Sequence, residues 1–130
     1  MPRDLVFTPD APAPPSIYSH AVKAAGLVFV SGTAPTDPAT GQIVAGTAGA
    51  QVAQCLRNIS AILDAAGSSL DKAVSATLVV ANEADFAAIN PAINEEWLRW
   101  FPTDPPARQG AKMPLQLPGL LVSIAMIAEA

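Results

Sequence analysis

One arginine, Arg108, carries the clearest chemical signal in this sequence. Pro105 and Pro106 precede it and keep the backbone extended, and the strand-like run 111–115 follows it. A guanidinium held at the start of a strand presents a planar set of N–H donors that matches a carboxylate. An ordinary exposed loop arginine is the simpler interpretation, so the rest of the chain has to decide between the two.

Four further polar residues stand among apolar ones: Tyr18, Ser31, Asn90 and Ser123. Each has an ordinary structural explanation, namely a half-buried aromatic, a strand end, an exposed helix residue and a small core residue. His20 is interpreted as a strand or interface residue and not as a catalyst. Taken singly, none of these residues predicts a function.

Several reaction classes are not supported by the sequence. One cysteine, Cys55, and one histidine, His20, cannot supply a zinc site, and the histidine has no acidic partner nearby for a Ser-His-Asp triad. The eleven carboxylates fall outside the interiors of the predicted strands, where burial would raise their pKa values. The glycines near the turn at 37–41 lack the Lys-Ser/Thr signature of a phosphate loop. We therefore expect no metal, no nucleotide and no other cofactor.

The composition indicates one domain, residues 1–130, with an unusually apolar surface. Apolar residues make up 51% of the chain and charged residues 14%, against about 25% charged in an average globular domain. The net charge is −4 and the seven basic residues are scattered, so we expect no nucleic acid partner.

The expected compartment is the cytoplasm. The first residues lack the pattern of a signal peptide, and no apolar run approaches the ~18 residues of a membrane span, so no membrane partner is expected. A single cysteine fits a reducing compartment.

Hydrophobic periodicity predicts about six strands and two helices. A helical pattern runs over 47–66 and ends at Gly67, and a second runs over 84–100, with Phe86, Ile89, Ile93, Trp97 and Phe101 on one stripe. Alternating or apolar runs predict strands at 5–7, 18–23, 27–31, 73–80, 107–115 and 120–128. The expected fold is therefore α+β, with the first three strands forming a meander.

Two helices can cover only one face of such a sheet. Yet the strand at 120–128 is apolar on both sides: Leu120, Val122, Ile124 and Met126 alternate with Leu121, Ser123, Ala125 and Ile127. The uncovered face needs a partner, and a second copy of the chain is the economical one, so we expect an obligate homo-oligomer.

Taken together, motifs along almost the whole chain resemble the Rid (YjgF-type) reactive-intermediate deaminases. The matching segments, in chain order, are I-Y-S-H-A-V at 17–22 (P-Y-S-Q-A-V in the family), L-V-F-V-S-G at 27–32, D-P-A-T-G at 37–41, the helix 51–67, D-F to Asn90, P-A-R at 106–108 and the closing strand from L-P-G at 117–119 to Ala128. The order and spacing of so many motifs make a chance resemblance very unlikely.

The resemblance implies a chorismate-mutase-like α+β subunit, a homotrimer, and ligand clefts between subunits. It further implies a 2-iminoacid or enamine deaminase that hydrolyses a small reactive imine carboxylate to a 2-keto acid and ammonia. In that family an arginine, here Arg108, grips the carboxylate. The other implied binding positions are Tyr18, Ser31, Gly32, Asn90, Gln109 and Gly110.

Two positions depart from the family pattern. Ser123 stands where typical deaminases have a glutamate that helps to orient the attacking water, and Gly110 stands where a cysteine is common. We expect Arg108, Ser31 and Ser123 to carry the catalysis, with water held by Ser123 or by backbone carbonyls.

Three alternatives stay open. The first is a non-catalytic trimer of the same family that binds a small carboxylate and has a regulatory role. The second is a tautomerase acting through Pro2 after removal of Met1, although Arg3-Asp4 is a poor setting for such a site. The third, a ribonuclease, fits badly with the acidic composition and the absent acid–base pair.

Overall fold

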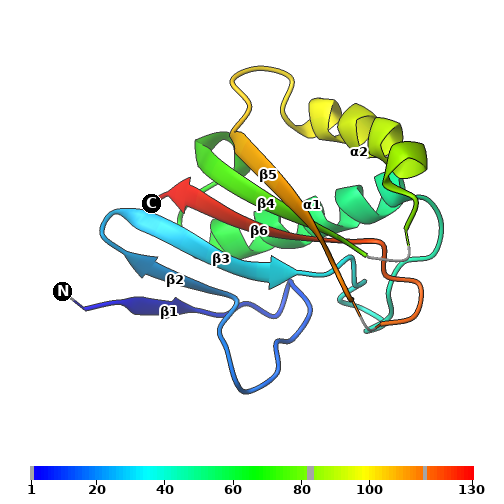
Figure 1. Ribbon diagram of the computed structural model, residues 1–130. Coiled ribbons are helices and arrows are strands. Elements are labelled where there is room, and N and C mark those ends of the chain that lie inside the picture. Colours follow the sequence, from blue (N-terminus) through cyan, green and yellow to red (C-terminus); the bar gives the residue numbers. More distant parts are fainter. Residues whose placement is uncertain (1, 82–83, 116) are drawn as a thin grey trace.

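The computed structural model describes residues 2–81, 84–115 and 117–130 of the chain. In this part of the chain six strands form one mixed sheet, and two α-helices, α1 (Ala48–Ala65) and α2 (Phe86–Trp100), lie on one face of it (Figure 1). The strands are β1 (Asp4–Val6), β2 (Ala21–Ala24), β3 (Leu27–Thr33), β4 (Ala73–Ala81), β5 (Ala107–Met113) and β6 (Val122–Glu129). A short 3-10 turn, η1 (Leu70–Lys72), precedes β4. The α+β class, the two helices and the six strands are as predicted.

The strand order is β1-β2-β3-β6-β4-β5. The first three strands form the predicted antiparallel meander, and β6 inserts antiparallel between β3 and β4. β4 and β5 are parallel, which requires a crossover, and α2 provides it. β5 is therefore an edge strand, and all seven of its residues are exposed.

Helix α1 forms because its apolar residues recur at helical spacing and its ends are capped. Val52, Leu56, Ile59 and Leu63 are fully buried on the face that meets the sheet. Each such side chain contributes about 1.5–3 kcal/mol of burial free energy. The Thr47 hydroxyl accepts a hydrogen bond from Ala50 N at 3.1 Å, and Gly67, with φ of +81°, follows the last turn.

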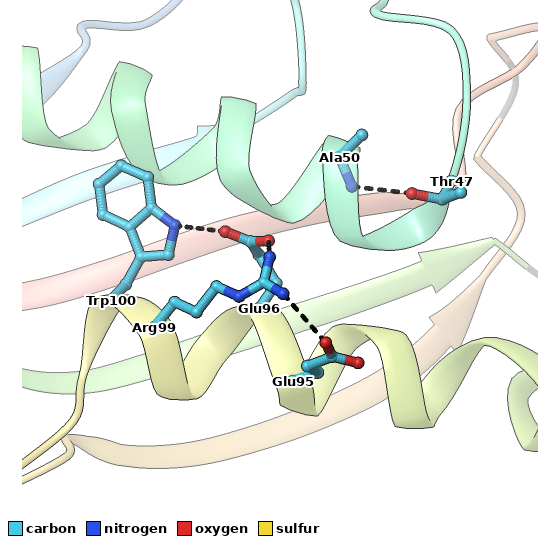
Figure 2. A network of polar contacts seen from close by, with 6 residues as sticks. All are labelled: Thr47, Ala50, Glu95, Glu96, Arg99 and Trp100. Atoms are coloured by element: carbon cyan, nitrogen blue, oxygen red, sulfur yellow. Dashed lines mark hydrogen bonds and ion pairs between the residues drawn. The ribbon is translucent and has the colours of Figure 1, made fainter.

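Helix α2 is stabilised along its exposed side by charge pairs. Arg99 donates to Glu95 at 3.0 Å and to Glu96 at 3.1 Å, and Trp100 Nε1 donates to the other oxygen of Glu96 at 2.9 Å (Figure 2). The Thr47 cap of α1 lies beside this network (Figure 2). Exposed pairs of this kind add little individually, but they keep the C-terminal half of α2 helical up to the strand that carries Arg108.

The two faces of the sheet differ sharply. On the helix-covered face Val28, Val30, Ile124 and Met126 are buried in the core. The opposite face, which we call the open face, carries mostly uncharged side chains from every strand: Leu5, Val22, Leu27, Phe29, Ser75, Thr77, Val79, Gln109, Ala111, Ser123, Ala125 and Ile127. Glu129, which pairs with Leu27 at the end of β6, is its one charged residue in the described strands. Neither helix lies on the open face (Figure 1), and Leu5 is 54% and Phe29 40% exposed. The two-sided apolar character predicted for the last strand is therefore present.

Several element boundaries differ from those predicted. The strand expected at 18–23 begins only at Ala21, because residues 16–18 turn, and β5 ends at Met113 instead of residue 115. Phe86 was expected in the core, yet it is 43% exposed, because a cavity separates the first turns of α2 from β4 and β5. Ile93, Trp97 and Phe101 are buried as expected. None of the helices in the described part of the chain combines the length and hydropathy that a bilayer crossing requires.

The Cys55 thiol is fully buried in the face of α1 that meets β6, and burial raises its pKa far above the ordinary value of 9.0. Folded protein therefore keeps this proton at pH values where the unfolded chain releases it. Stability contributed by the protonated thiol is present below pH 9 and is lost as the pH rises above it.

We predict that the free energy of unfolding of the parent falls relative to that of Cys55→Ala by up to about 1.4 kcal/mol per pH unit above pH 9. Chemical denaturation of both proteins between pH 7 and pH 10.5 measures the difference. Parallel curves over this whole range would contradict the prediction.

Candidate functional site

The residues implied as a ligand site fall into two groups that lie in different cavities. The arginine cavity, of about 390 Å³, is lined by Arg108, Gln109, Gly110 and Lys112 of β5, by Phe86 and Asn90 of α2, and by apolar residues of β4. The serine cavity, of about 150 Å³, is lined by Tyr18, Ser31, Gly32 and Thr33 and by residues of the proline-rich segment 12–14. The two cavities share no lining residue.

Arg108 points toward α2 because it stands on the helix-covered side of β5, opposite Ala76 in the register. Its Nη2 donates a hydrogen bond to Asn94 Oδ1 at 2.7 Å, and its guanidinium carbon lies 5.2 Å from the ring centroid of Trp97. A hydrogen bond and a cation–π contact together orient an otherwise exposed side chain. The guanidinium is thus held at the wall of the arginine cavity, where an anion can reach it.

Two neighbours of Arg108 have different environments. Gln109 points to the open face, where its Nε2 donates to Thr77 Oγ1 at 3.1 Å, so only its backbone faces a ligand in the arginine cavity. Gly110 pairs with Leu78 and leaves the cavity floor without a side chain. Asn90, half-buried in α2, faces the same cavity.

Ser31 lies on β3, toward the opposite edge of the sheet from β5, and hydrogen bonds to the backbone just before β2 hold it in place. Ser31 Oγ donates to Ser19 O at 2.6 Å, and Ser31 N donates to His20 O at 3.0 Å. The register of β3 shifts between Val30 and Thr33, which is a β-bulge. The Tyr18 side chain is 47% exposed at the mouth of the serine cavity.

Ser123 belongs with the serine group and not with Arg108. Its Oγ donates to Thr33 O at 3.3 Å. A Cβ placed on Gly32 would lie 3.7 Å from the Oγ of Ser123. Ser123 alternates with the buried Val122 and Ile124, so it stands on the open face, whereas Arg108 faces α2. In addition, β6 and β4 separate β3 from β5, a span of about 14 Å.

Within one chain, therefore, the implied catalytic residues Arg108 and Ser123 do not come together. The structure brings together Arg108, Gln109, Gly110 and Asn90 in one place and Tyr18, Ser31, Gly32 and Ser123 in another. Sequence reasoning missed Asn94 as a contact of Arg108 and Lys112 as a wall of its cavity. Alternation along β5 was the signal for Lys112, since it lies four residues after Arg108 and hence on the same face.

Acidic and metal-binding groups are scarce around both cavities. No Asp or Glu is among the described residues that line them, and Glu83 lies outside the described residues. Across the described part of the chain, no three His, Cys, Asp or Glu residues are grouped to hold a metal ion.

Comparison with known proteins identifies the family. The sequence profile described as Endoribonuclease L-PSP matches residues 8–130. The chain is 34% identical over 129 residues, 99% of each chain, to a protein of Acinetobacter baylyi named 3-aminoacrylate deaminase RutC. A crystal structure of a Rid-family protein of unknown function from Yersinia pestis superposes with a TM-score of 0.89 at 31% identity, covering 99% of this chain and 100% of the other. This chain belongs to the Rid (YjgF-type) family.

Another relative within the Rid family is named for the reaction that the resemblance implied. A protein of Capra hircus named 2-iminobutanoate/2-iminopropanoate deaminase is 37% identical over 100 residues, which cover 77% of this chain and 73% of that one. Relatives of this Rid chain therefore carry deaminase names, and the helices and mixed sheet described above are those of the family.

His20 stands where the family pattern has a glutamine, and its ring binds two backbone groups beside the serine cavity. Its Nδ1 accepts a hydrogen bond from Thr8 N at 3.2 Å, so the ring carries its proton on Nε2, which lies 2.6 Å from Pro12 O. The ring is only 6% exposed. It thereby ties the proline-rich segment, which lines the serine cavity, to the start of β2.

We predict that His20→Ala lowers the free energy of unfolding by about 1–3 kcal/mol, since Thr8 N–H and Pro12 C=O both lose a buried partner. His20→Gln is the matched control, because an amide offers both a donor and an acceptor and should retain most of the stability. Denaturant unfolding measures both variants, and hydrogen exchange at the Thr8 amide should accelerate only in His20→Ala. Equal stability of the Ala variant and the parent would contradict the assignment.

Proposed function

We propose that this protein is a 2-iminoacid or enamine deaminase that hydrolyses a small reactive imine carboxylate to a 2-keto acid and ammonia. The observation that carries the proposal is Arg108, which occupies the position of the family's carboxylate-binding arginine and lines a cavity of about 390 Å³. Relatives named as deaminases of 3-aminoacrylate and of 2-iminobutanoate or 2-iminopropanoate support the reaction class.

The proposed reaction needs little beyond positioning. The carboxylate of the substrate binds the Arg108 guanidinium and displaces the Asn94 oxygen from it. Ser31 and neighbouring backbone amides orient the imine nitrogen. Water adds to the C=N carbon, the nitrogen takes up a proton, and ammonia leaves as the C=O bond forms. Since a protonated imine is already electrophilic, orientation and exclusion of bulk water supply most of the assistance.

Ser123 takes the part of the missing glutamate in this proposal. Its hydroxyl donates to Thr33 O, so its oxygen lone pairs remain able to accept a hydrogen bond from the attacking water. A serine hydroxyl is a weak base, so it positions water without removing its proton.

A second copy of the chain is part of the proposal. Arg108 and the Ser31 group lie in separate cavities, so a complete site requires the arginine cavity of one copy to meet the serine cavity of its neighbour. The largely uncharged open face and the exposed edge strand β5 are surfaces that such an assembly would bury. We therefore propose the chorismate-mutase-like homotrimer of the family.

The principal alternative is a non-catalytic homotrimer that binds a small carboxylate and serves regulation. The specific observation in its favour is Ser123, which leaves the described residues around both cavities without an acid. Arg108 serves a binder and an enzyme equally well, so turnover has to distinguish them.

Other activities receive less support. The matched profile carries the word endoribonuclease, but the one histidine of this chain is buried and bonded to two backbone groups, which leaves it no role in acid–base cleavage of RNA. Pro2 is exposed and is not among the described residues that line either cavity, so a tautomerase site there has no support from these cavities. A cytoplasmic, reducing location remains our proposal from the single, buried cysteine.

We predict that Arg108→Ala lowers kcat/KM for 2-iminopropanoate about tenfold to a hundredfold, because a charge-assisted pair worth about 1.5–3 kcal/mol is lost. The imine is generated in place by an amino-acid oxidase, and keto-acid and ammonia release are followed. Arg99→Ala is the matched control, since Arg99 is exposed on α2 and lines neither cavity.

Mixed trimers test whether the site joins two copies. Co-expressed Arg108→Ala and Tyr18→Ala chains should show more activity than either homotrimer, since one interface in each mixed trimer combines two intact halves. Undiminished activity of Arg108→Ala alone would overturn the proposed function.

We further predict that Ser123→Glu raises kcat severalfold with little change in KM, because a carboxylate accepts from the attacking water more strongly than a hydroxyl does. Ser123→Gln has the same length without the charge and should not show the gain. If the parent and both variants release no keto acid above the uncatalysed rate while still binding pyruvate, the protein is a non-catalytic carboxylate binder and not a deaminase.

A further inference from the structure

One face of β5 carries two cations separated by a residue without a side chain. Arg108, Gly110 and Lys112 alternate along the strand, and all three line the arginine cavity. Arg108 pairs with Ala76 and Lys112 with Val80 in the register, and both partners are buried on the helix-covered face. The two cationic side chains therefore point to the same side of the sheet.

The floor between the two cations is bare backbone. A Cβ on Gly110 would lie 3.3 Å from Leu78 O, so even a methyl group is a tight fit there. The Cα atoms of Arg108 and Lys112 are about 13 Å apart, and the two long side chains can bring their charged ends closer. No side chain projects from Gly110 into the cavity between the two cations, so a ligand lying along the strand meets backbone there.

The ends of the cavity are distinct. Asn94 and Trp97 hold the Arg108 guanidinium toward the C-terminal half of α2, whereas Phe86 and Asn90 come from its first turns. Because α2 is the crossover between two parallel strands, its first turns lie near the end of β5 that carries Lys112. The cavity thus has one cation toward each end.

The chemistry between these ends is apolar and lacks negative charge. Leu78, which pairs with Gly110, and Val80, Phe86 and Ile93 supply its apolar walls, and none of the described lining residues is an Asp or Glu. Such a positive cavity in a chain of net charge −4 favours an anion at each end and carbon atoms between them. A monocarboxylate would use Arg108 and leave Lys112 without a ligand group.

We propose that the preferred ligand is a short dicarboxylate, with the carboxylate beside the reacting carbon on Arg108 and the distal carboxylate on Lys112. The proposal rests on the function proposed above and specifies its substrate as the imine of an acidic amino acid. Lys112 is then a specificity-determining residue, and Gly110 places no side chain between the two cations that one molecule must reach.

Binding of a matched pair of acids tests this assignment. Glutarate and pentanoate have the same number of carbon atoms and differ in one terminal carboxylate, and calorimetry on the intact protein measures both. We expect glutarate to bind about fivefold more tightly, the effect of one partly exposed charge pair. Lys112→Gln should abolish this preference and leave pentanoate binding unchanged. Lys72→Gln, at an exposed lysine outside the cavity, should change neither.

The outcomes separate this inference from the proposed function. Equal binding of the two acids by the parent, or a preference that survives Lys112→Gln, overturns the dicarboxylate assignment, and hydrolysis of 2-iminopropanoate by the same samples then leaves the deaminase proposal standing. If Arg108→Ala hydrolyses 2-iminopropanoate as fast as the parent, the deaminase proposal fails independently of the glutarate result. Loss of the glutarate preference in Lys112→Gln, with 2-iminopropanoate turnover retained, supports both.

Discussion

The side chains of Arg108 and Ser123 lie on opposite faces of one sheet, and this separation limits which groups a single copy can bring to one ligand. Arg108 faces α2 from an edge strand, while Ser123 stands on the open face two strands away. Backbone pairing fixes both orientations, because a one-residue register slip would turn every buried side chain of a strand outward. A single copy can bind an anion at Arg108 and can order water near Ser123, but it cannot do both to one molecule.

The same sheet explains why a partner copy is the natural way to close that gap. Both helices pack on one side, so the side chains of the open face stay without cover, and Glu129 at the end of β6 is the one charged residue that the register places among them in the described strands. An exposed apolar face and an unpaired edge strand are liabilities for a monomer. Burying them would favour association, and in the proposed assembly the arginine cavity of one copy meets a neighbour's serine group.

Much of the fold was predictable from local sequence. Helix α1 was predicted within one residue at each end, because an apolar stripe, the Thr47 cap and Gly67 all indicate the same limits. The meander and the two-faced last strand followed from alternation. Phe86 was misplaced in the core, because helical spacing says which residues share a face but not how closely that face approaches the sheet.

The site was predictable in a different way. The family resemblance identified Arg108 and the serine group, yet their division between two cavities depends on strand order and bulge position, which no local pattern contains. Likewise His20 was expected in a strand or an interface, and its two backbone partners come from the segment 8–12, whose path the composition alone does not specify.

The two departures from the family pattern act in separate halves of the site. Gly110 opens the floor beside Arg108, and Ser123 removes an acid from the other half, so neither change compensates the other within one chain. Of the two, only the Ser123 change alters the charge of the site. Without the glutamate, and with Lys112 at the wall, the site becomes more positive and has no strong base, so it holds anions more firmly than it moves protons. In the proposed deaminase, rate enhancement would then come from positioning the imine and shielding it from bulk water, and the geometry of the proposed subunit boundary would be the main determinant of activity.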